Sequence, residues 1–253
     1  MTQKLVALIP ARLKSKRIKN KVLYLVDGLP IIEHVRRRAL ISGLFSDVII
    51  VTGDKKIIEI VKKNNGKVIE SKKKHISGTS RCAEIAKNVK ADIFVIIFAD
   101  ELFILPSQLK TFCNLIKKDK ISNAWNATTQ LLNKDLFLKE VVKCEVDKQY
   151  FIKNFFRLGS NNSKIKSVGI LAFRRKLFLK YNKIKKTKKE ILHSIEQFRL
   201  VENKYYLRSV FIKNILNSIN VPGDIKIIEK QFVERSHQNK MLKATKNFHD
   251  NKF

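Results

Sequence analysis

Short apolar runs alternate with helical patterns along the first half of the chain. The runs are rich in Val and Ile and have the length of strands, at residues 4–9, 47–51, 67–70 and 92–98. Between them, apolar residues recur at helical spacing near residues 30–43, 55–65, 79–89 and 107–118. This alternation predicts a mostly parallel sheet, buried on both faces and flanked by helices.

The pattern becomes richer in extended segments after Trp125. Strands are expected in ATTQLL, EVVKCEV, YFIKNFF and SVGILAF, which begin at residues 127, 140, 150 and 167. Helices are expected at about 174–181, 188–200 and 222–235. Because no repeat, low-complexity block or clear linker separates the halves, we predict one α/β unit over residues 1–253. It is a Rossmann-like sheet with an appended α/β part.

The composition fits a protein that builds its own core. The chain has 253 residues, 44% of them hydrophobic, which suffices for a buried interior. No apolar run approaches the roughly 20 residues of a membrane span, and the N-terminus lacks a signal-peptide pattern. A cytoplasmic location without membrane insertion is therefore expected. The cysteines are odd in number, lack a C-x-x-C pattern and are expected in the core, at Cys82, Cys113 and Cys144.

The net charge of +31, from 53 basic and 22 acidic residues, allows two interpretations. Dense Lys and Arg surfaces bind nucleic acid by releasing counterions. Here, however, lysine is scattered together with Ile and Asn, as a general compositional bias would leave it, with clusters only at 14–21, 72–74 and 183–189. No recognition helix, zinc finger or RNP motif accompanies the charge. Nucleic acid is thus not the expected partner, and most lysines should be solvated.

Candidate chemistry follows two of the expected strands. The run 4–9 is followed by a basic loop, and the run 92–98 is followed by Asp100 and Glu101. The basic residues of the loop are Arg12, Lys14, Lys16, Arg17, Lys19 and Lys21. Ligands of open parallel sheets bind at the carboxyl ends of the strands. Cations there suit triphosphate oxygens, and carboxylates suit Mg²⁺. Asp100 alone would equally fit a turn or a helix cap, so the combination carries the functional interpretation.

The same segments resemble a known family. PARLKSKRIKNK at 10–21 looks like the P-A-R-x-x-S-x-R-x-x-x-K signature of cytidylyltransferases that activate acidic sugars, especially 3-deoxy-D-manno-octulosonate (KDO). Four further blocks follow in the family's order, HISGTSRCAEIA at 75–86, FADE at 98–101, VGILAFRR at 168–175 and SIEQFRLVEN at 194–203. The resemblance implies one domain of the nucleotide-diphospho-sugar transferase type. Its parts would be a CTP-binding half (1–122), a sugar-binding and dimerisation half (123–235) and a basic tail (236–253).

The resemblance also implies a reaction and its residues. CMP would pass from CTP to the anomeric hydroxyl of KDO or a close relative, with release of pyrophosphate. The CMP-sugar would serve the synthesis of lipopolysaccharide or another surface polysaccharide. The enzyme would be a homodimer that uses Mg²⁺. The expected catalytic residues are Arg12 and Lys21, which would contact the triphosphate, and Asp100, which would hold the metal. CTP would be bound by Arg12, Ser15, Arg17, Lys21, Ser77, Gly78 and Thr79. The Ser-Gly-Thr segment also reads as the start of a helix.

The acidic sugar would be bound by three residues of the second half. Arg157 would meet its carboxylate, while Glu196 and Gln197, on the helix expected at 188–200, would bind its hydroxyls. Each has a plainer interpretation. Arg157 also fits the surface of an edge strand, and a Glu-Gln pair is common on exposed helices.

The sequence departs from the family pattern at several positions. Asn220, in NVPGD at 220–224, replaces a second metal-binding aspartate, and an amide brings no charge to Mg²⁺. Phe98, Leu102, Ser167 and Leu171 replace Gln, Pro, His and Tyr. These changes leave two enzyme hypotheses, a less polar pocket for another acidic sugar or a weakened KDO enzyme. Asn220 also leaves open the hypothesis of a non-catalytic homologue that binds nucleotide or sugar. A third hypothesis, a nucleic-acid-binding protein, is supported by the charge alone.

Overall fold

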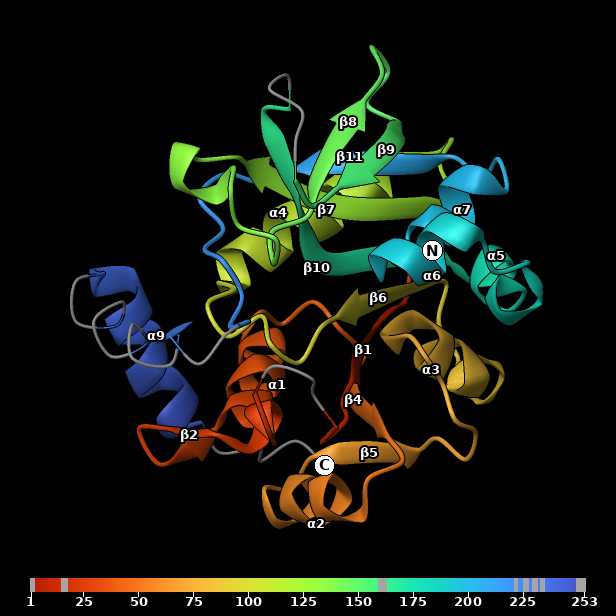
Figure 1. Ribbon diagram of the computed structural model, residues 1–253. Coiled ribbons are helices and arrows are strands. Elements are labelled where there is room, and N and C mark those ends of the chain that lie inside the picture. Colours follow the sequence, from red (N-terminus) through yellow and green to blue (C-terminus); the bar gives the residue numbers. More distant parts are fainter. Residues whose placement is uncertain are drawn as a thin grey trace.

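A central twisted sheet organises the chain, whose computed structural model describes residues 3–14, 18–158, 163–220, 223–224, 228, 232 and 235–248 (Figure 1). The strand order along the sheet is β11-β7-β10-β6-β1-β4-β5. Every pairing along this path is parallel except those of β10 with β6 and β7. The strands are β1 (Leu5–Pro10), β4 (Asp47–Thr52), β5 (Lys67–Glu70), β6 (Ile93–Ile97), β7 (Ala124–Gln130), β10 (Ile165–Arg174) and β11 (Leu207–Phe211). The predicted mostly parallel α/β fold is confirmed.

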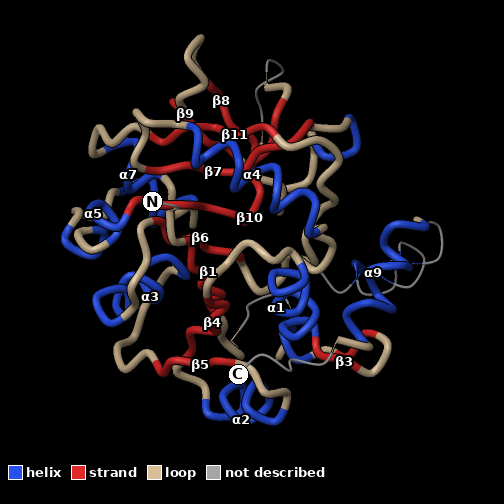
Figure 2. Tube along the Cα trace, turned by 180° about the vertical axis from the view of Figure 1, so that it is seen from behind, coloured by secondary structure: helices blue, strands red, loops and turns tan. Residues whose placement is uncertain are grey.

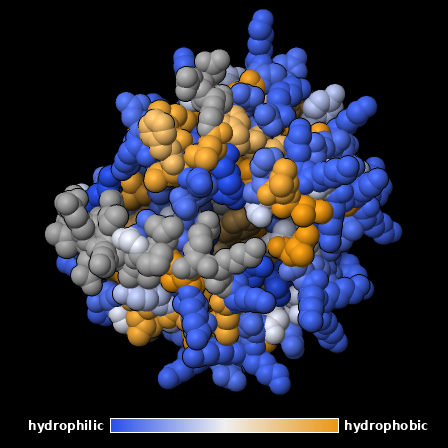
Figure 3. All heavy atoms as spheres, in the orientation of Figure 1, coloured by the Kyte–Doolittle hydropathy of each residue, from blue (hydrophilic) through white to orange (hydrophobic). Residues whose placement is uncertain are grey.

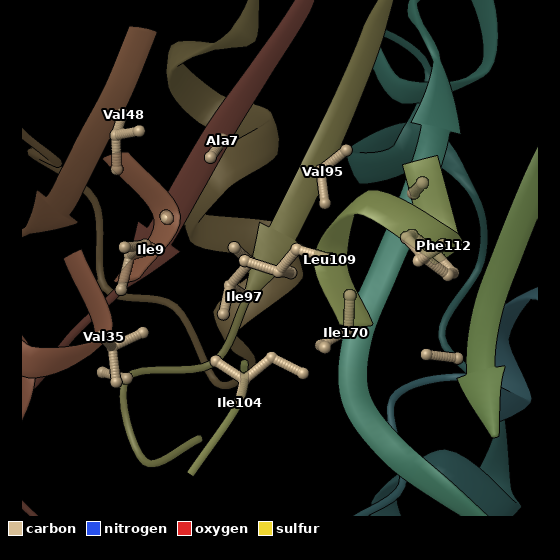
Figure 4. Packing of buried hydrophobic residues seen from close by; sticks show 14 of the residues in the cluster. Ala7, Ile9, Val35, Val48, Val95, Ile97, Ile104, Leu109, Phe112 and Ile170 are labelled. Atoms are coloured by element: carbon tan, nitrogen blue, oxygen red, sulfur yellow. The ribbon is translucent and has the colours of Figure 1, made fainter. Parts of the chain in front are cut away.

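Helices cover both faces of this sheet because alternate residues of each strand point to opposite sides. Ala7 and Ile9 of β1 share a core with α1, α2 and α4, whereas Val6 and Leu8 share one with α3, α5 and α7. Figure 4 shows the first core, with Val35 of α1 and Leu109 of α4 directed toward the strands. The helices are α1 (Ile31–Ile41), α2 (Lys55–Lys63), α3 (Gly78–Ile85), α4 (Pro106–Lys118), α5 (Arg175–Phe178) and α7 (Phe198–Glu202).

The second half adds a small antiparallel extension to the sheet. β8 (Lys143–Val146) pairs with the start of β10, and β9 (Ile152–Phe156) pairs with β8. The four extended segments expected after Trp125 therefore form strands β7 to β10, but β11 was not predicted. Short elements complete the fold. The first half has the hairpin of β2 (Leu25–Val26) with β3 (Leu29–Pro30) and the 3-10 turns η1 (Lys21–Leu23) and η2 (Ala86–Asn88), and the second half has η3 (Asn133–Asp135) and η4 (Tyr181–Lys183).

The helix predicted over residues 188–200 is wrong. It is broken into α6 (Lys188–His193) and α7, with Ser194 between them in the left-handed conformation (φ 51°). The N–H of Ser194 donates to the Glu190 carbonyl and closes the first helix. Glu196 and Gln197 therefore lie in the turn before α7 rather than on a continuous helix. Hydrophobic spacing continues across the break and could not reveal it.

The chain continues into α9 (Ser236–Lys246), within the segment predicted as a basic tail. Most of the helix predicted at 222–235 lies outside the described residues. Both views place α9 beside α1 (Figures 1 and 2). His34 of α1 contacts the Thr245 hydroxyl at 3.1 Å and the Val26 carbonyl at 2.8 Å, and Arg38 donates to Gln238 at 3.0 Å. Polar contacts thus anchor α9 on α1.

Two expectations about composition can be compared with the structure. All three cysteines are buried and unpaired with one another, as expected for core residues. Within the described part of the chain, no helix combines the length and the hydrophobicity needed to cross a bilayer.

Candidate functional site

The candidate site lies where β1 and β6, which pair in parallel, end side by side (Figure 1). Lys21 Nζ donates to Asp100 Oδ2 at 2.6 Å and to the Ile219 carbonyl at 2.7 Å. Three segments that are far apart in sequence therefore meet at one ammonium group. Arg12 follows β1 and is exposed. Two of the predicted CTP ligands, Ser15 and Arg17, lie outside the described residues.

The two carboxylates after β6 have different surroundings. Asp100 is half-buried and paired with Lys21, whereas Glu101 is only 4% exposed and accepts the N–H of Gly169 at 2.8 Å. Burial, followed by the charge of Asp100, raises the pKa of Glu101 to about 8, so Glu101 is largely protonated at neutral pH. A Cβ on Gly169 would come within 2.5 Å of Glu101 Oε1. Glu101 is therefore a fixed support below Asp100, a role that sequence reasoning missed.

The predicted cytosine-binding turn opens α3. Ser77 caps this helix by accepting the N–H of Ser80 at 3.2 Å, which confirms the expected helix start. Gly78 approaches the end of β1 so closely that a Cβ would meet Pro10 at 2.9 Å. Only a glycine allows this contact without displacement, and it brings the turn to the strand end that carries Arg12. The binding of cytosine stays a prediction.

Glu196 reaches the same turn from the second half. Thr79 donates its hydroxyl to one oxygen of Glu196 and its backbone N–H to the other, the latter at 3.3 Å. Burial raises the pKa of Glu196 despite the opposing hydrogen bonds from Thr79 and Ser77. The structure therefore joins a predicted sugar ligand to a predicted CTP ligand, and Glu196 does not lie on an exposed helix face.

Gln197 points to a buried asparagine that was not predicted. Its Nε2 lies 3.4 Å from Asn126 Oδ1, which also accepts the Ser167 hydroxyl at 2.8 Å. Asn126 Nδ2 donates to the carbonyls of Val168 and Ile170, inside the irregular part of β10. Asn126 therefore shapes the segment that presents Gly169 to Glu101. A polar residue inside the buried run AWNATT was the only sequence signal for it.

Arg157 ties three loops together. Its guanidinium donates to the carbonyls of Lys139 at 2.8 Å, His193 at 2.9 Å and Ser194 at 3.2 Å. It follows β9 but is more than a surface residue of an edge strand. Its contact with a sugar carboxylate stays a prediction.

The departures from the family pattern separate into core and surface positions. Leu102 and Leu171 are fully buried and do not line an open pocket. Phe98 is half-buried and packs between two glycines. A Cβ added to Gly78 would lie 3.5 Å from the Phe98 ring, and one added to Gly169 would lie 3.1 Å from the Phe98 side chain. Figure 3 shows the surface hollowed near the end of β6, with apolar side chains beside the hollow. Of these departures from the family pattern, Phe98 is therefore best placed to change which ligand binds.

The donors fit a magnesium ion shared with phosphates. The described residues contain no cluster of three His, Cys, Asp or Glu side chains that could enclose a metal. Asn220 follows Ile219, and its backbone N–H donates to Asp224 Oδ2 at 2.6 Å. The Asp224 carboxylate is therefore a second carboxylate at this loop. The same loop contacts Asp100, because the Ile219 N–H donates to the Asp100 carbonyl at 3.3 Å. Mg²⁺ commonly takes one or two carboxylates and completes its shell with phosphate oxygens and water.

Comparisons with known proteins identify the family of the chain. Residues 6–215 match the family described as cytidylyltransferase. The 3-deoxy-manno-octulosonate cytidylyltransferase of Geotalea daltonii is 29% identical over 90% of this chain and 98% of its own length. That of Fusobacterium nucleatum is 32% identical over 81% of this chain and 87% of its own length.

Solved structures extend the comparison to the fold. The synthetase of CMP-2-keto-3-deoxy-manno-octonic acid, complexed with CTP, matches with a TM-score of 0.83 and 26% identity over 91% of this chain and 99% of that chain. An inositol-1-phosphate CTP transferase from T. maritima shares the fold with a TM-score of 0.69 at 15% identity, over 97% and 98%. The family resemblance of the sequence motifs is confirmed, and the chain belongs to the cytidylyltransferase family.

Proposed function

We propose that this cytidylyltransferase transfers CMP from CTP to the anomeric hydroxyl of 3-deoxy-manno-octulosonate (KDO), or of a close relative, and releases pyrophosphate. The observation that carries the proposal is the meeting of Lys21, Asp100 and the Ile219 carbonyl at the paired ends of β1 and β6. Relatives named for this activity match along 90% of the chain, which supports the choice of acid.

Catalysis in this proposal is positioning and neutralisation of charge. The anomeric oxygen attacks the α-phosphorus of CTP, and the bond from that phosphorus to the bridging oxygen of pyrophosphate breaks. Arg12 and Lys21 neutralise the triphosphate. Lys21 is buried and held by two oxygens, so its ammonium is already in place before the reaction. Asp100, and more weakly Asn220, would hold Mg²⁺, which would supply further positive charge against the phosphate oxygens.

The second half would bind the acid. Arg157 takes the sugar carboxylate in exchange for some of its bonds to backbone carbonyls, because a carboxylate carries the opposite full charge and can accept two parallel bonds from the guanidinium, whereas a carbonyl is neutral. Glu196 and Gln197 face the hydroxyls from the turn before α7. Ser77, Gly78 and Thr79, together with Ser15 and Arg17, hold the nucleotide.

The proposal includes a homodimer in the cytoplasm. Arg157 gathers segments whose neighbouring side chains are strongly exposed and apolar, with Phe137 84% exposed. The other members of this surface are Leu138, Leu158, Ile191 and Leu192. A second copy that covers them would remove this apolar area from water. Light scattering of the protein and of a Leu192→Glu variant tests the assembly, and a monomeric parent protein would exclude it.

The activity is tested by pyrophosphate release from CTP with Mg²⁺. KDO, its 8-amino analogue and a nonulosonic acid are compared as acceptors, with ATP, GTP and UTP as nucleotide controls. We expect turnover with CTP and one acid. Binding of CTP without pyrophosphate release from any acid would instead favour the non-catalytic homologue that Asn220 keeps open.

A second variant tests the assigned metal loop. Asn220→Asp adds a carboxylate where the family pattern has one, so half-maximal activity should need less Mg²⁺. An unchanged Mg²⁺ requirement would remove Asn220 from the metal site.

A further inference from the structure

A second charged cluster lies at the start of β10, in the stretch that pairs with β7 and β8 rather than with β6. Lys166 of β10 donates to Asp135 Oδ2 of η3 at 2.6 Å. The pair is enclosed, since Lys166 is 5% exposed and Asp135 is fully buried. Neither residue belongs to the family motifs, and neither touches the predicted ligands directly. A buried pair of this kind costs desolvation, so its retention calls for a further partner.

Asn217 is that partner, and its amide meets both charges. Its Oδ1 accepts from Lys166 Nζ at 2.5 Å, while its Nδ2 donates to Asp135 Oδ1 at 2.9 Å. Lysine can only donate and an ionised aspartate can only accept, so the orientation of the amide is fixed. Burial alone would raise the pKa of Asp135, but the bonds from Lys166 and Asn217 outweigh it and lower this pKa. Asp135 is therefore ionised at neutral pH.

The segment that carries Asn217 leads straight into the candidate site. Two residues later, the Ile219 N–H donates to the Asp100 carbonyl at 3.3 Å and the Ile219 carbonyl accepts from Lys21 at 2.7 Å. Asn220 follows immediately. Two residues of chain span at most about 7 Å, so the contacts of Asn217 limit where Ile219 can lie.

We propose that Asn217, held by Lys166 and Asp135, is a positioning residue that sets Ile219 and Asn220 in the nucleotide and metal site. The inference rests on the proposed function, because the importance of this loop depends on CTP and Mg²⁺ binding there. It adds three residues that do not touch the substrate but place the loop that does.

The test is Asn217→Leu, which keeps the size of the side chain and removes both of its hydrogen bonds. The Lys166–Asp135 pair stays in place. Gln130→Met is the matched control, because Gln130 holds the same segment three residues earlier, through Asn214, at 2.8 Å and 3.1 Å. A general loosening of the segment would therefore affect both variants alike.

The first readout is hydrogen exchange of the Ile219 amide in protein without ligand. The second is the Mg²⁺ concentration for half-maximal turnover, measured together with calorimetric binding of CTP. In Asn217→Leu we expect faster exchange at Ile219 and a Mg²⁺ requirement raised about tenfold or more, as when the outer partners of a metal site are lost. Gln130→Met should keep the Mg²⁺ requirement of the parent protein.

Three results would overturn the inference. The first is an unchanged exchange rate at the Ile219 amide of Asn217→Leu. The second is faster exchange there with an unchanged dependence of turnover on Mg²⁺ and CTP. The third is an equal effect of Asn217→Leu and Gln130→Met. A purely structural role would lower the active fraction or the melting temperature without shifting the Mg²⁺ requirement. If the parent protein turned over none of the acids, the proposed function would fail, yet the exchange rates would still decide whether Asn217 holds the loop. Lys166→Met should act in the same direction.

Discussion

Each half of the molecule holds a lysine–aspartate pair, and the two pairs are equal in length but different in surroundings. Lys21 with Asp100 and Lys166 with Asp135 both show an N–O distance of 2.6 Å. The Asp100 side chain is 22% exposed, whereas that of Asp135 is completely buried. The carboxylate of the first pair is open to solvent, so a ligand can reach it. The second is closed, so it can only hold structure in place.

Length therefore says little about what an ion pair does. Asp100 lies at a strand end and faces a segment, Ile219–Asn220, that comes from the far end of the described chain. Asp135 has all of its contacts satisfied by Lys166, Asn217 and the Leu132 N–H. What differs is burial, because Asp135 is closed to any other partner whereas the Asp100 carboxylate is open to solvent.

The largest expected effect is on turnover, at the open pair. Asp100→Asn keeps the shape of the side chain but removes the charge that we propose holds Mg²⁺ and that pairs with Lys21. Pyrophosphate release should fall by about 10²–10³-fold, as on loss of one electrostatic contact to a transition state. Circular dichroism and the melting temperature should stay close to those of the parent protein. Turnover retained at the parent level would remove Asp100 from the site.

The closed pair should respond mainly in stability, with only an indirect effect on the Mg²⁺ requirement through Asn217. Lys166→Met leaves the buried Asp135 without its counter-charge, so the free energy of unfolding should fall by about 3–5 kcal/mol. Urea unfolding measures this loss. Adding Asp135→Leu in the same chain should recover much of it, because no buried charge then remains unpaired. A loss under about 1 kcal/mol in Lys166→Met would mean that the interior reorganises around Asp135.

The two pairs also show what sequence could predict. Lys21 and Asp100 follow strands of a parallel sheet, and the carboxyl ends of such strands meet at one edge. The alternation of strands and helices was enough to bring them together. Lys166 and Asp135 are 31 residues apart and Asp135 and Asn217 are 82 apart, and no periodic pattern joins them. Only the irregular loops around β10 and β11 do so.

The fold shows the same division. β1, β4 and β6 are recognisable because continuous Val and Ile runs are typical of strands buried on both faces. β11 was missed because Leu207–Phe211 carries Arg and Ser and becomes a strand only by pairing with β7. The break at Ser194 was missed because its left-handed backbone has neither Gly nor Asn as a marker.

A buried neutral group offers a contrast to both charged pairs. Burial, with the nearby Arg38 and Arg37, lowers the pKa of His34 from 6.5 to about 4. Between these values the unfolded chain binds the proton and the folded chain does not, so stability falls as pH falls. Between about pH 7.5 and pH 5, His34 should cost about 2 kcal/mol of unfolding free energy.

Urea unfolding of the parent protein and of His34→Gln at both pH values tests this effect. At neutral pH the variant should have a lower free energy of unfolding, because it loses the His34 contacts with Val26 and Thr245. It should lack the fall in unfolding free energy that His34 causes between these two pH values. Equal acid sensitivity of the two proteins would show that His34 becomes protonated without loss of the fold, for example by release of α9.

The smallest effect is expected at a third lysine–aspartate pair, on the surface. Lys67 Nζ lies 2.5 Å from Asp47 Oδ1, as close as in the other pairs, but its side chain is 43% exposed. Water and salt screen such a pair, so Lys67→Met should change the unfolding free energy by less than about 1 kcal/mol. The small change should shrink further in 0.5 M salt, at about a 4 Å screening length. A loss as large as that of Lys166→Met would mean that length, not exposure, governs these pairs, and the contrast between Asp100 and Asp135 would lose its basis.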